Sequence, residues 1–257
     1  MTAALDQSPP RRVDSTPSDV AFFYTQEPQA KPGNRTNFDL PEDRNLYICL
    51  QTLFKFHPHF DAMLRGILEH DPNGLLLLLP DRSEHRTRQL AERLKQSLGP
   101  IRGRVVWLDR LAKGHYYTLL SNVNLDTPYF SGGSTTTQSL VLSVPTVPRA
   151  SPHVRGRITI GWMRILKTME LMAETGADYA DIAVACAADP TFRAAVCNKL
   201  SANRPRLFRR AAVVREHEDL FDAARAGRPR LDWGQTGSQI GYHVIPKRRR
   251  LPRTREP

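Results

Sequence analysis

Lys55 lies in a loop where its side chain could bind an anion. In the segment QTLFKFHPHF, Lys55 follows an apolar run, lies between Phe54 and Phe56, and is followed by Pro58, which restricts the chain. A lysine on a short loop between a strand and a helix faces the edge of a sheet at which ligands bind. We therefore predict that Lys55 binds an anion, with a solvated surface charge as the alternative.

A glycine- and hydroxyl-rich segment is the second candidate. Within DTPYFSGGSTTTQSL, two glycines lead into a predicted helix that opens with three hydroxyl side chains: Gly132, Gly133, Ser134, Thr135 and Thr136. Backbone N–H groups at a helix start, the helix dipole and hydroxyls together suit a phosphate group. The segment matches neither the Walker lysine pattern nor G-x-G-x-x-G. A glycine-rich turn with an ordinary Ser/Thr helix cap remains the alternative.

Other kinds of chemistry find little support. The histidines nearest these segments lack the spacing of metal ligands on the predicted elements: His57, His59, His70 and His85. There is no G-x-S-x-G elbow of a hydrolase. The three cysteines form no CxxC pair, so we expect neither a zinc site nor a disulfide framework. A reducing compartment fits this cysteine content best. No apolar run of about 18 residues and no signal core are present, so we expect a cytoplasmic protein that makes no membrane contact.

The net charge of +11 is unevenly distributed along the 257 residues. Residues 228–257 hold eight Lys/Arg and two Asp/Glu, a net charge of +6, which leaves +5 for the other 227 residues. This basic tail has little apolar content and is predicted to be disordered. Since such tails are often merely solubilising, specific nucleic-acid binding is the less favoured interpretation.

Short apolar runs alternate with segments of helical period from residue 40 onward. The runs predicted as strands are 46–50, 75–79, 104–108, 124–126 and 145–147, and the helical segments between them are 59–70, 83–98, 114–123 and 134–142. This alternation predicts an α/β fold with a doubly wound, mostly parallel, Rossmann-like sheet. Helices are predicted to follow at 157–171, 178–187, 189–200 and 208–227.

The composition divides the chain into three parts. Residues 1–35 are rich in proline and are predicted to form a linker or arm. Residues 36–227 carry the predicted sheet and the helices that follow it. Residues 228–257 form the basic tail.

Three segments, in this order along the chain, resemble the O-linked N-acetylglucosamine transferase family, and within it the bacterial, SPINDLY-like branch. They are LPEDRNLYICLQTLFKFHPHFDAMLRGILEHDPNGLLLLLP, then DTPYFSGGSTTTQSLVLSVPTV with VRGRITIGWMRILKTMEL, and finally DYADIAVACAADPTFRAAVCNKLSANRPRLF. The resemblance covers residues 36–225 without large gaps.

That family has the two-lobed glycosyltransferase fold called GT-B, of which this chain would supply the C-terminal, donor-binding lobe. The resemblance implies a UDP-sugar donor, usually UDP-N-acetylglucosamine, Ser/Thr acceptors on proteins, and inversion at the anomeric carbon with no metal or other cofactor. It places Lys55 on the β-phosphate as the catalytic cation and residues 132–136 on the same diphosphate. It also places Lys113, His115 and Gln138 at the nucleoside.

The sequence also departs from the family pattern. Gln138 stands where an acidic residue usually accepts hydrogen bonds from the ribose, and SVPTV replaces the commoner G-T-P-V. No tetratricopeptide array and no N-terminal lobe accompany the resemblance, so we expect the chain to be either a fragment of a larger transferase or one piece of a split enzyme whose cleft a partner chain completes. A catalytically inactive module that binds a nucleotide or a partner protein is therefore the alternative to an active transferase.

Overall fold

A computed structural model describes residues 34–108, 121–208 and 211–225 of the chain. The described residues fall into two units, which are considered separately. The first contains the sheet and its helices and extends to Arg215, and the second contains the remainder of the last described helix, α8 (Ala211–Arg225).

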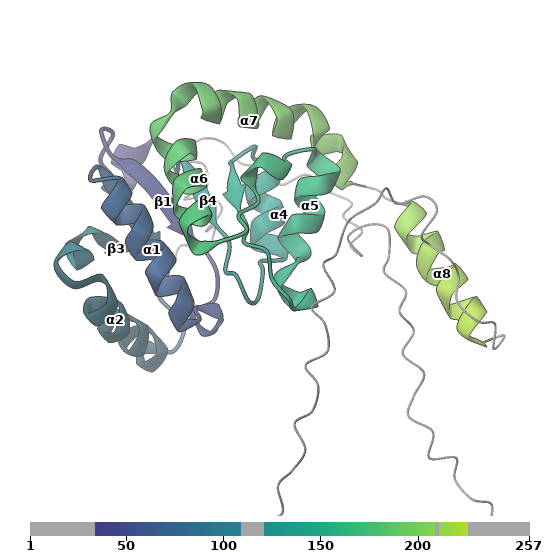
Figure 1. Ribbon diagram of the computed structural model, residues 1–257, viewed down its shortest axis with the longest axis horizontal. Coiled ribbons are helices and arrows are strands. Elements are labelled where there is room, and N and C mark those ends of the chain that lie inside the picture. The colour runs from purple at the N-terminus through teal and green to yellow at the C-terminus, as the bar shows by residue number, and fades with distance from the viewer. Residues whose placement is uncertain (1–33, 109–120, 209–210, 226–257) are drawn as a thin grey trace, which may run out of the picture. The chain divides into compact units, whose positions relative to one another are not determined.

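Five parallel strands form the sheet of the first unit (Figure 1). In chain order they are β1 (Asn45–Cys49), β2 (Gly74–Leu78), β3 (Val105–Trp107), β4 (Val123–Leu125) and β5 (Thr146–Val147). Their order in the sheet is β3-β2-β1-β4-β5, with Tyr47 paired with Leu76 on one side and Val123 on the other. This confirms the predicted doubly wound parallel sheet.

Six described helices of the first unit connect and surround these strands. They are α1 (Pro58–His70), α2 (Glu84–Leu98), α4 (Ser134–Val141), α5 (Ile158–Leu166), α6 (Gly176–Ala188) and α7 (Pro190–Asn203). The helices α1 and α6 lie side by side against the sheet, with α2 beyond α1 (Figure 1). Short segments of 3-10 helix lie between or beside these elements: Arg35–Phe38, Leu53–Lys55, Gly99–Arg104, Val154–Gly156, Met169–Leu171 and Arg204–Leu207.

Apolar side chains on both faces explain why the central strands are apolar throughout. Along β1, Tyr47 and Cys49 join the larger core beneath α1 and α6, whereas Leu46 and Ile48 join a smaller core with Leu40 on the opposite face. All four β1 side chains are fully buried. Two-sided burial of this kind is typical of parallel sheets.

The ends of two predicted helices can be compared directly with the structure. The helix expected over 157–171 ends at Leu166, because Lys167 adopts a left-handed conformation with φ of 58° and closes the helix. The Asp189-Pro190 start of the next predicted helix is confirmed, since the Asp189 carboxylate accepts hydrogen bonds from the backbone N–H of Thr191 and Phe192. The segment predicted as a helix at 114–123 lies mostly outside the described residues.

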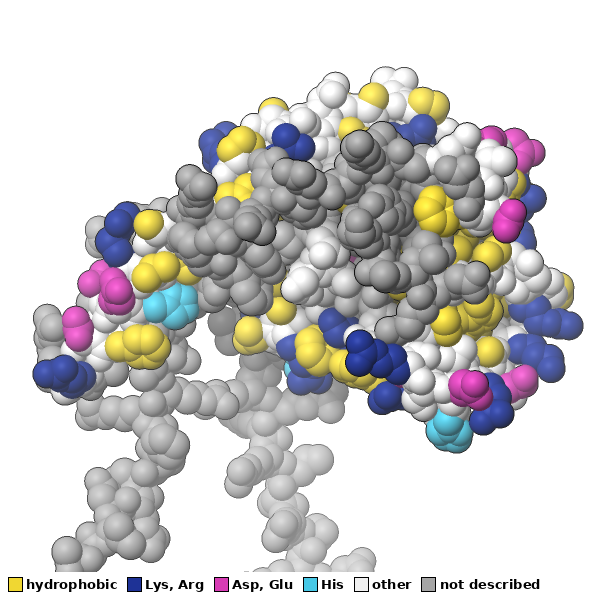
Figure 2. Space-filling model, turned by 180° about the vertical axis from the view of Figure 1, so that it is seen from behind, with side chains coloured by type: hydrophobic (Ala, Val, Ile, Leu, Met, Phe, Trp, Pro, Cys, Tyr) yellow, Lys and Arg dark blue, Asp and Glu magenta, His cyan; other side chains and the backbone are white. Residues whose placement is uncertain are grey.

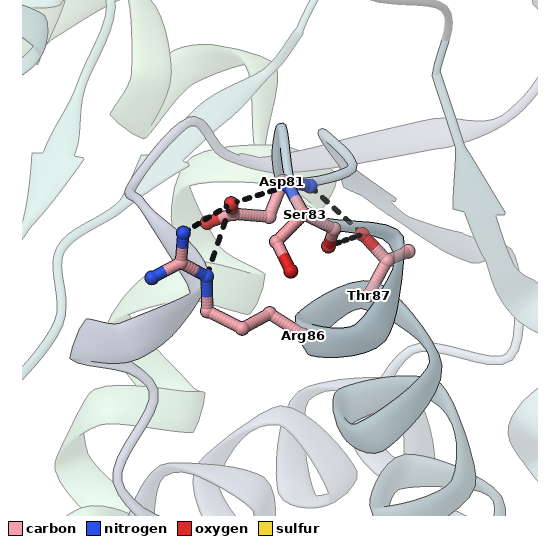
Figure 3. A network of polar contacts seen from close by, with 4 residues as sticks. All are labelled: Asp81, Ser83, Arg86 and Thr87. Atoms are coloured by element: carbon pink, nitrogen blue, oxygen red, sulfur yellow. Dashed lines mark hydrogen bonds and ion pairs between the residues drawn. The ribbon is translucent and has the colours of Figure 1, made fainter.

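A polar network fixes the loop between β2 and α2 (Figure 3). The Asp81 carboxylate accepts hydrogen bonds from the Ser83 backbone N–H at 2.9 Å and from Arg86 Nε at 3.1 Å. The Asp81 backbone N–H in turn donates to Thr87 Oγ1 at 2.9 Å. The Ser83 side chain, at the N-cap of α2, makes no capping hydrogen bond. The start of α2 is instead ordered by the Asp81 carboxylate and the Thr87 hydroxyl.

Within the part of the chain that the structure describes, none of the helices has the length and apolar character that a membrane crossing requires. On the face seen in Figure 2, the described Lys and Arg side chains are scattered among hydrophobic ones and do not form one continuous stripe.

Candidate functional site

The order of the strands reverses between β1 and β4, since β2 and β3 extend from one side of β1 and β5 extends from the far side of β4. The loops that follow β1 and β4 therefore leave the same edge of the sheet in diverging directions. In open α/β sheets a crevice at such a point is where ligands bind. Both segments that the sequence analysis singled out lie here.

Lys55 ends a 3-10 turn in the loop after β1, and its side chain reaches across to the loop after β4. Its Nζ donates hydrogen bonds to Gln51 Oε1 at 3.0 Å and to the Ser131 backbone carbonyl at 3.0 Å. Nζ also lies over the Phe130 ring, 4.4 Å from its centroid. The structure thus brings Lys55 and the glycine-rich segment together, as the sequence analysis required.

Gln51 links the lysine to the helix that follows the glycines. This side chain is 3% exposed, and its Nε2 donates a hydrogen bond to Thr135 Oγ1 at 3.0 Å. The contacts form a continuous chain from the Ser131 carbonyl through Lys55 and Gln51 to the first turn of α4. A group that binds Lys55 is therefore adjacent to the start of α4.

The two glycines play different parts. A Cβ on Gly132 would lie 2.1 Å from Thr136 Oγ1 and 2.2 Å from Gln51 Nε2, so only glycine fits. A Cβ on Gly133 would meet no atom within 4 Å. Gly132 thus lets the Gln51 and Thr136 side chains close over the backbone, whereas Gly133 leaves the start of α4 open.

The first turn of α4 presents its polar groups unequally. Ser134 is exposed, Thr135 is half-buried, and Thr136 is fully buried, with its hydroxyl turned toward Gly132. Gly133 is the N-cap of α4 and supplies no side chain to bind the first N–H groups of the helix. The accessible polar groups of this turn are therefore the Ser134 and Thr135 side chains and the uncapped backbone.

Asp126, directly after β4, is a buried carboxylate beneath this loop. It is 1% exposed, and its Oδ1 accepts a hydrogen bond from the Gly132 backbone N–H at 2.7 Å. Burial raises its pKa, and this is opposed by the Thr159 side chain, the Gly132 amide, the Ser131 side chain and the positive charge of Lys55. The Ser131 and Thr159 hydroxyls exert this influence without completing hydrogen bonds of normal geometry.

The charge of Lys55 is shaped by the same surroundings. Burial lowers the pKa of Lys55, while the negative charge of Asp126 acts in the opposite direction. The ammonium group is half-buried and is held by two neutral oxygen atoms. An anionic oxygen would be a stronger acceptor for it than either of these.

The remaining predicted site residues are placed only in part. Gln138 is half-buried, one turn into α4, on the same side of the helix as Ser134 and Thr135. Lys113 and His115 lie outside the described residues. Among the residues that are described, no group of three or more His, Cys, Asp or Glu side chains could hold a metal ion.

The comparisons with known proteins agree with this geometry. The sequence model of glycosyl transferase family 41 matches residues 27–212. The chain belongs to this family. The match includes Lys55, the glycine-rich segment and every strand of the sheet, so the candidate site lies within the family 41 region.

Two curated relatives show how much of the sequence is shared. The chain is 32% identical over 125 residues to the Arabidopsis thaliana protein named "Probable UDP-N-acetylglucosamine--peptide N-acetylglucosaminyltransferase SEC", a stretch that covers 47% of this chain and 12% of that protein. It is 29% identical over 160 residues to the Caenorhabditis elegans UDP-N-acetylglucosamine--peptide N-acetylglucosaminyltransferase, covering 61% of this chain and 14% of that protein. The chain thus spans a small part of these relatives.

The solved structures establish the fold. A mutant of the Thermobaculum terrenum O-GlcNAc transferase superposes with a TM-score of 0.63 at 21% identity, covering 72% of this chain and 38% of that one. Sucrose-phosphate synthase from Thermosynechococcus elongatus superposes with a TM-score of 0.53 at 18% identity, covering 75% and 48%. The family 41 chain therefore has the α/β architecture of one lobe of a GT-B glycosyltransferase.

The sequence analysis missed three residues of this site. Gln51, Ser131 and Asp126 contribute, respectively, an amide, a backbone carbonyl and a buried carboxylate to the contacts around Lys55 and Gly132. Gln51 and Asp126 could have been found, because each is the first polar residue after a strand whose carboxyl end faces the crossover. The Ser131 carbonyl is a backbone group, and no residue type signals it.

Proposed function

We propose that this chain is the nucleotide-sugar-binding lobe of a glycosyltransferase. In this proposal the diphosphate of a UDP-sugar binds where the Lys55 ammonium, the Gln51 amide and the first turn of α4 meet. The observation that carries the proposal is the Lys55 hydrogen bond to the Ser131 carbonyl, which unites a cation with a glycine-rich helix start. Membership of family 41 supports the same assignment.

The chemistry of sugar transfer explains why these groups suit the task. Cleavage of the sugar–phosphate bond builds negative charge on the departing diphosphate, and donors fixed in advance at that position lower the barrier. Lys55 supplies a positive charge, and the uncapped N–H groups and hydroxyls of Ser134 and Thr135 supply neutral donors. Each well-placed donor of this kind contributes about 3 kcal/mol.

The finer features of the reaction belong to the same proposal. The donor is UDP-N-acetylglucosamine, the acceptors are Ser and Thr of proteins, and the anomeric carbon is inverted, as in the bacterial, SPINDLY-like branch. Gln138 binds the ribose, and Lys113 and His115 contribute to the uracil site. The names of the two relatives, which both include UDP-N-acetylglucosamine--peptide N-acetylglucosaminyltransferase, support the donor sugar and a peptide acceptor.

We propose further that the reaction takes place in the cytoplasm. The reaction needs no metal or other cofactor, because Lys55 and α4 supply the donors that a leaving diphosphate requires. In this proposal an N-terminal lobe, from a partner chain or from the same polypeptide, completes the site, since a GT-B site lies between two lobes. Activity of the completed assembly should therefore survive treatment with EDTA. Loss of activity that Mg²⁺ or Mn²⁺ restores would contradict this part of the proposal.

Isothermal titration calorimetry with UDP tests the site directly. The 257-residue chain should bind UDP, and Lys55→Ala should weaken binding by about 100-fold, because the loss of one charged donor costs about 3 kcal/mol. Gln51→Ala should weaken it less, because the amide acts partly through Lys55. Lys199→Ala is the matched control, since this lysine is exposed on α7 and forms an ion pair with Glu170, which is not one of the site residues.

The outcomes separate this proposal from its rivals. Absence of UDP binding by the wild-type chain would contradict it and would favour a module that binds a partner protein. UDP binding without transferase activity in the presence of an N-terminal lobe would favour an inactive nucleotide-binding module. The presence of Gln138 in place of an acidic residue is consistent with that alternative. Equal UDP affinity of the Lys55→Ala variant and the wild type would contradict the assigned role of Lys55.

A further inference from the structure

Two large aromatic side chains remain exposed beside Lys55. Phe54 is 61% exposed and Phe130 is 38% exposed, and their rings lie edge to face with centroids 6.0 Å apart. They come from different loops, one after β1 and the other after β4. Exposed aromatic pairs of this kind leave apolar area in water that a ligand would cover.

Local geometry holds each ring at the surface. The 3-10 turn Leu53–Lys55 buries Leu53 and turns Phe54 outward. The loop that carries Phe130 is tied back twice, because Thr127 Oγ1 donates to the Phe130 carbonyl at 2.6 Å and the Tyr129 hydroxyl lies 2.8 Å from His59 Nδ1, near the start of α1. The exposure of the pair is therefore built into the loops.

The position of Lys55 limits what can cover these rings. Lys55 Nζ lies 4.4 Å from the centroid of Phe130, which is within the reach of a single phosphate group. If the outer phosphate of a nucleotide sugar binds Lys55, the group attached to that phosphate is within reach of the exposed Phe130 and Phe54 rings. In a sugar nucleotide this group is a pyranose ring, one face of which consists of C–H bonds that match the negative face of an aromatic ring.

We propose that Phe54 and Phe130 form a platform against which the donor's pyranose ring packs beside the diphosphate, with the face of one aromatic ring and the edge of the other. This inference rests on the proposed function, because it takes Lys55 as the phosphate-binding cation. It adds two residues that recognise the sugar itself. The platform predicts that affinity for the sugar nucleotide exceeds affinity for the nucleotide alone by an amount that depends on the two rings.

Calorimetric titration of the full chain with UDP and with UDP-N-acetylglucosamine tests the platform. Phe54→Ala should raise the Kd for UDP-N-acetylglucosamine about fivefold more than the Kd for UDP, the effect of one aromatic contact. Phe130→Ala should show the same selective loss, together with a smaller change in UDP affinity, because its ring also contacts Lys55. Phe130→Tyr should restore the selective part.

Phe221→Ala is the matched control, since this side chain is 67% exposed on α8. It should leave both affinities unchanged, and thermal unfolding of all variants should match the wild type because both target rings are exposed. Equal loss of affinity for UDP and UDP-N-acetylglucosamine, or no loss in either variant, would overturn the platform and favour a protein surface as the occupant of the rings. Absence of UDP binding by the wild type would overturn the proposed function and the platform with it.

Discussion

The two edges of the sheet each hold a buried carboxylate, and the two carboxylates are treated very differently. At the amino edge, Asp71 is 6% exposed and precedes β2. At the carboxyl edge, Asp126 is 1% exposed and follows β4. Comparison of their partners distinguishes a structural polar cluster from one prepared for a ligand.

Asp71 lies in a cluster that satisfies itself. Its Oδ2 accepts hydrogen bonds from the Tyr47 hydroxyl at 2.7 Å and from Asn45 Nδ2 at 2.9 Å, and its Oδ1 accepts one from the Asn73 backbone N–H at 2.9 Å. The Arg104 guanidinium donates to the Asp71 backbone carbonyl at 2.7 Å. A carboxylate with donors on both oxygens holds strands and loops together and needs no ligand.

Asp126 lies in a cluster that remains incomplete. The Gly132 amide donates to one oxygen, yet burial raises the pKa of the carboxyl, and the Thr136 hydroxyl has no hydrogen-bond partner among the described residues. Nearby, the Lys55 ammonium has neutral acceptors only. Polar groups that are buried or constrained without full partners are typical of functional sites. The comparison therefore indicates a structural role for the amino edge and supports the proposed binding role of the carboxyl edge.

Glycine-to-alanine substitutions at the two edges should give the largest effects. At the carboxyl edge, Gly132→Ala places a Cβ 2.1 Å from Thr136 Oγ1, and at the amino edge Gly74→Ala places one 2.7 Å from Tyr47 Cε2. Each should lower the free energy of unfolding by about 3 kcal/mol, measured by urea denaturation.

Only the carboxyl-edge substitution should affect the ligand. At temperatures where both variants remain folded, Gly132→Ala should weaken UDP binding because the Gln51 and Thr136 side chains are displaced, whereas Gly74→Ala should leave it unchanged. Gly133→Ala, with nothing within 4 Å of the added methyl group, is the control for stability. Equal loss of UDP binding in the Gly74 and Gly132 variants would remove the distinction between the two edges.

Replacement of each aspartate by asparagine should change the stability by different amounts, both of intermediate size. Asp71→Asn replaces one carboxylate oxygen with an NH₂ group, which cannot accept the hydrogen bonds that this oxygen receives. The free energy of unfolding should therefore fall by about 2 kcal/mol. Asp126→Asn keeps an oxygen for the Gly132 amide and removes the cost of burying a charge, so stability at neutral pH should fall less or rise. Urea denaturation of both variants gives the comparison.

The pH dependence of this difference follows from the shifted pKa. Because burial raises the pKa of Asp126, the folded protein binds this proton more tightly than the unfolded chain does. Wild-type stability relative to Asp126→Asn should therefore increase as the pH falls through the folded-state pKa toward the ordinary aspartate range. A difference that stays constant across that range would show that the carboxyl group is not perturbed.

Much of the fold could be predicted from the sequence because its signals are local. The apolar runs and the helical period gave the strands and most helices, and Asp189-Pro190 gave the start of α7. The end of α5 at Leu166 was missed, because the left-handed conformation of Lys167 is not signalled by its residue type. At the site, Lys55 and Gly132 were predicted, but Gln51 was not, since its role depends on a contact with Thr135 that is 84 residues away in the chain.

The smallest expected effect concerns the protonation of Lys55. Burial lowers its pKa, so in the free protein the ammonium loses its proton at a lower pH than an ordinary lysine does. A diphosphate beside Nζ stabilises the charged form and raises this pKa again. UDP binding should therefore be accompanied by uptake of less than about one proton at alkaline pH, and affinity should decline as the pH rises through the lowered pKa.

Calorimetry in buffers of different ionisation enthalpy measures this uptake, because the observed binding enthalpy then varies with the buffer. Lys55→Met, which cannot take up a proton, should abolish the variation in whatever binding remains. The amino edge sharpens the comparison, because Tyr47→Phe alters the Asp71 cluster and should leave the proton uptake of UDP binding unchanged. Proton uptake that persists in the Lys55→Met variant would locate the titrating group elsewhere in the site and would separate the anion-binding role of the carboxyl edge from Lys55.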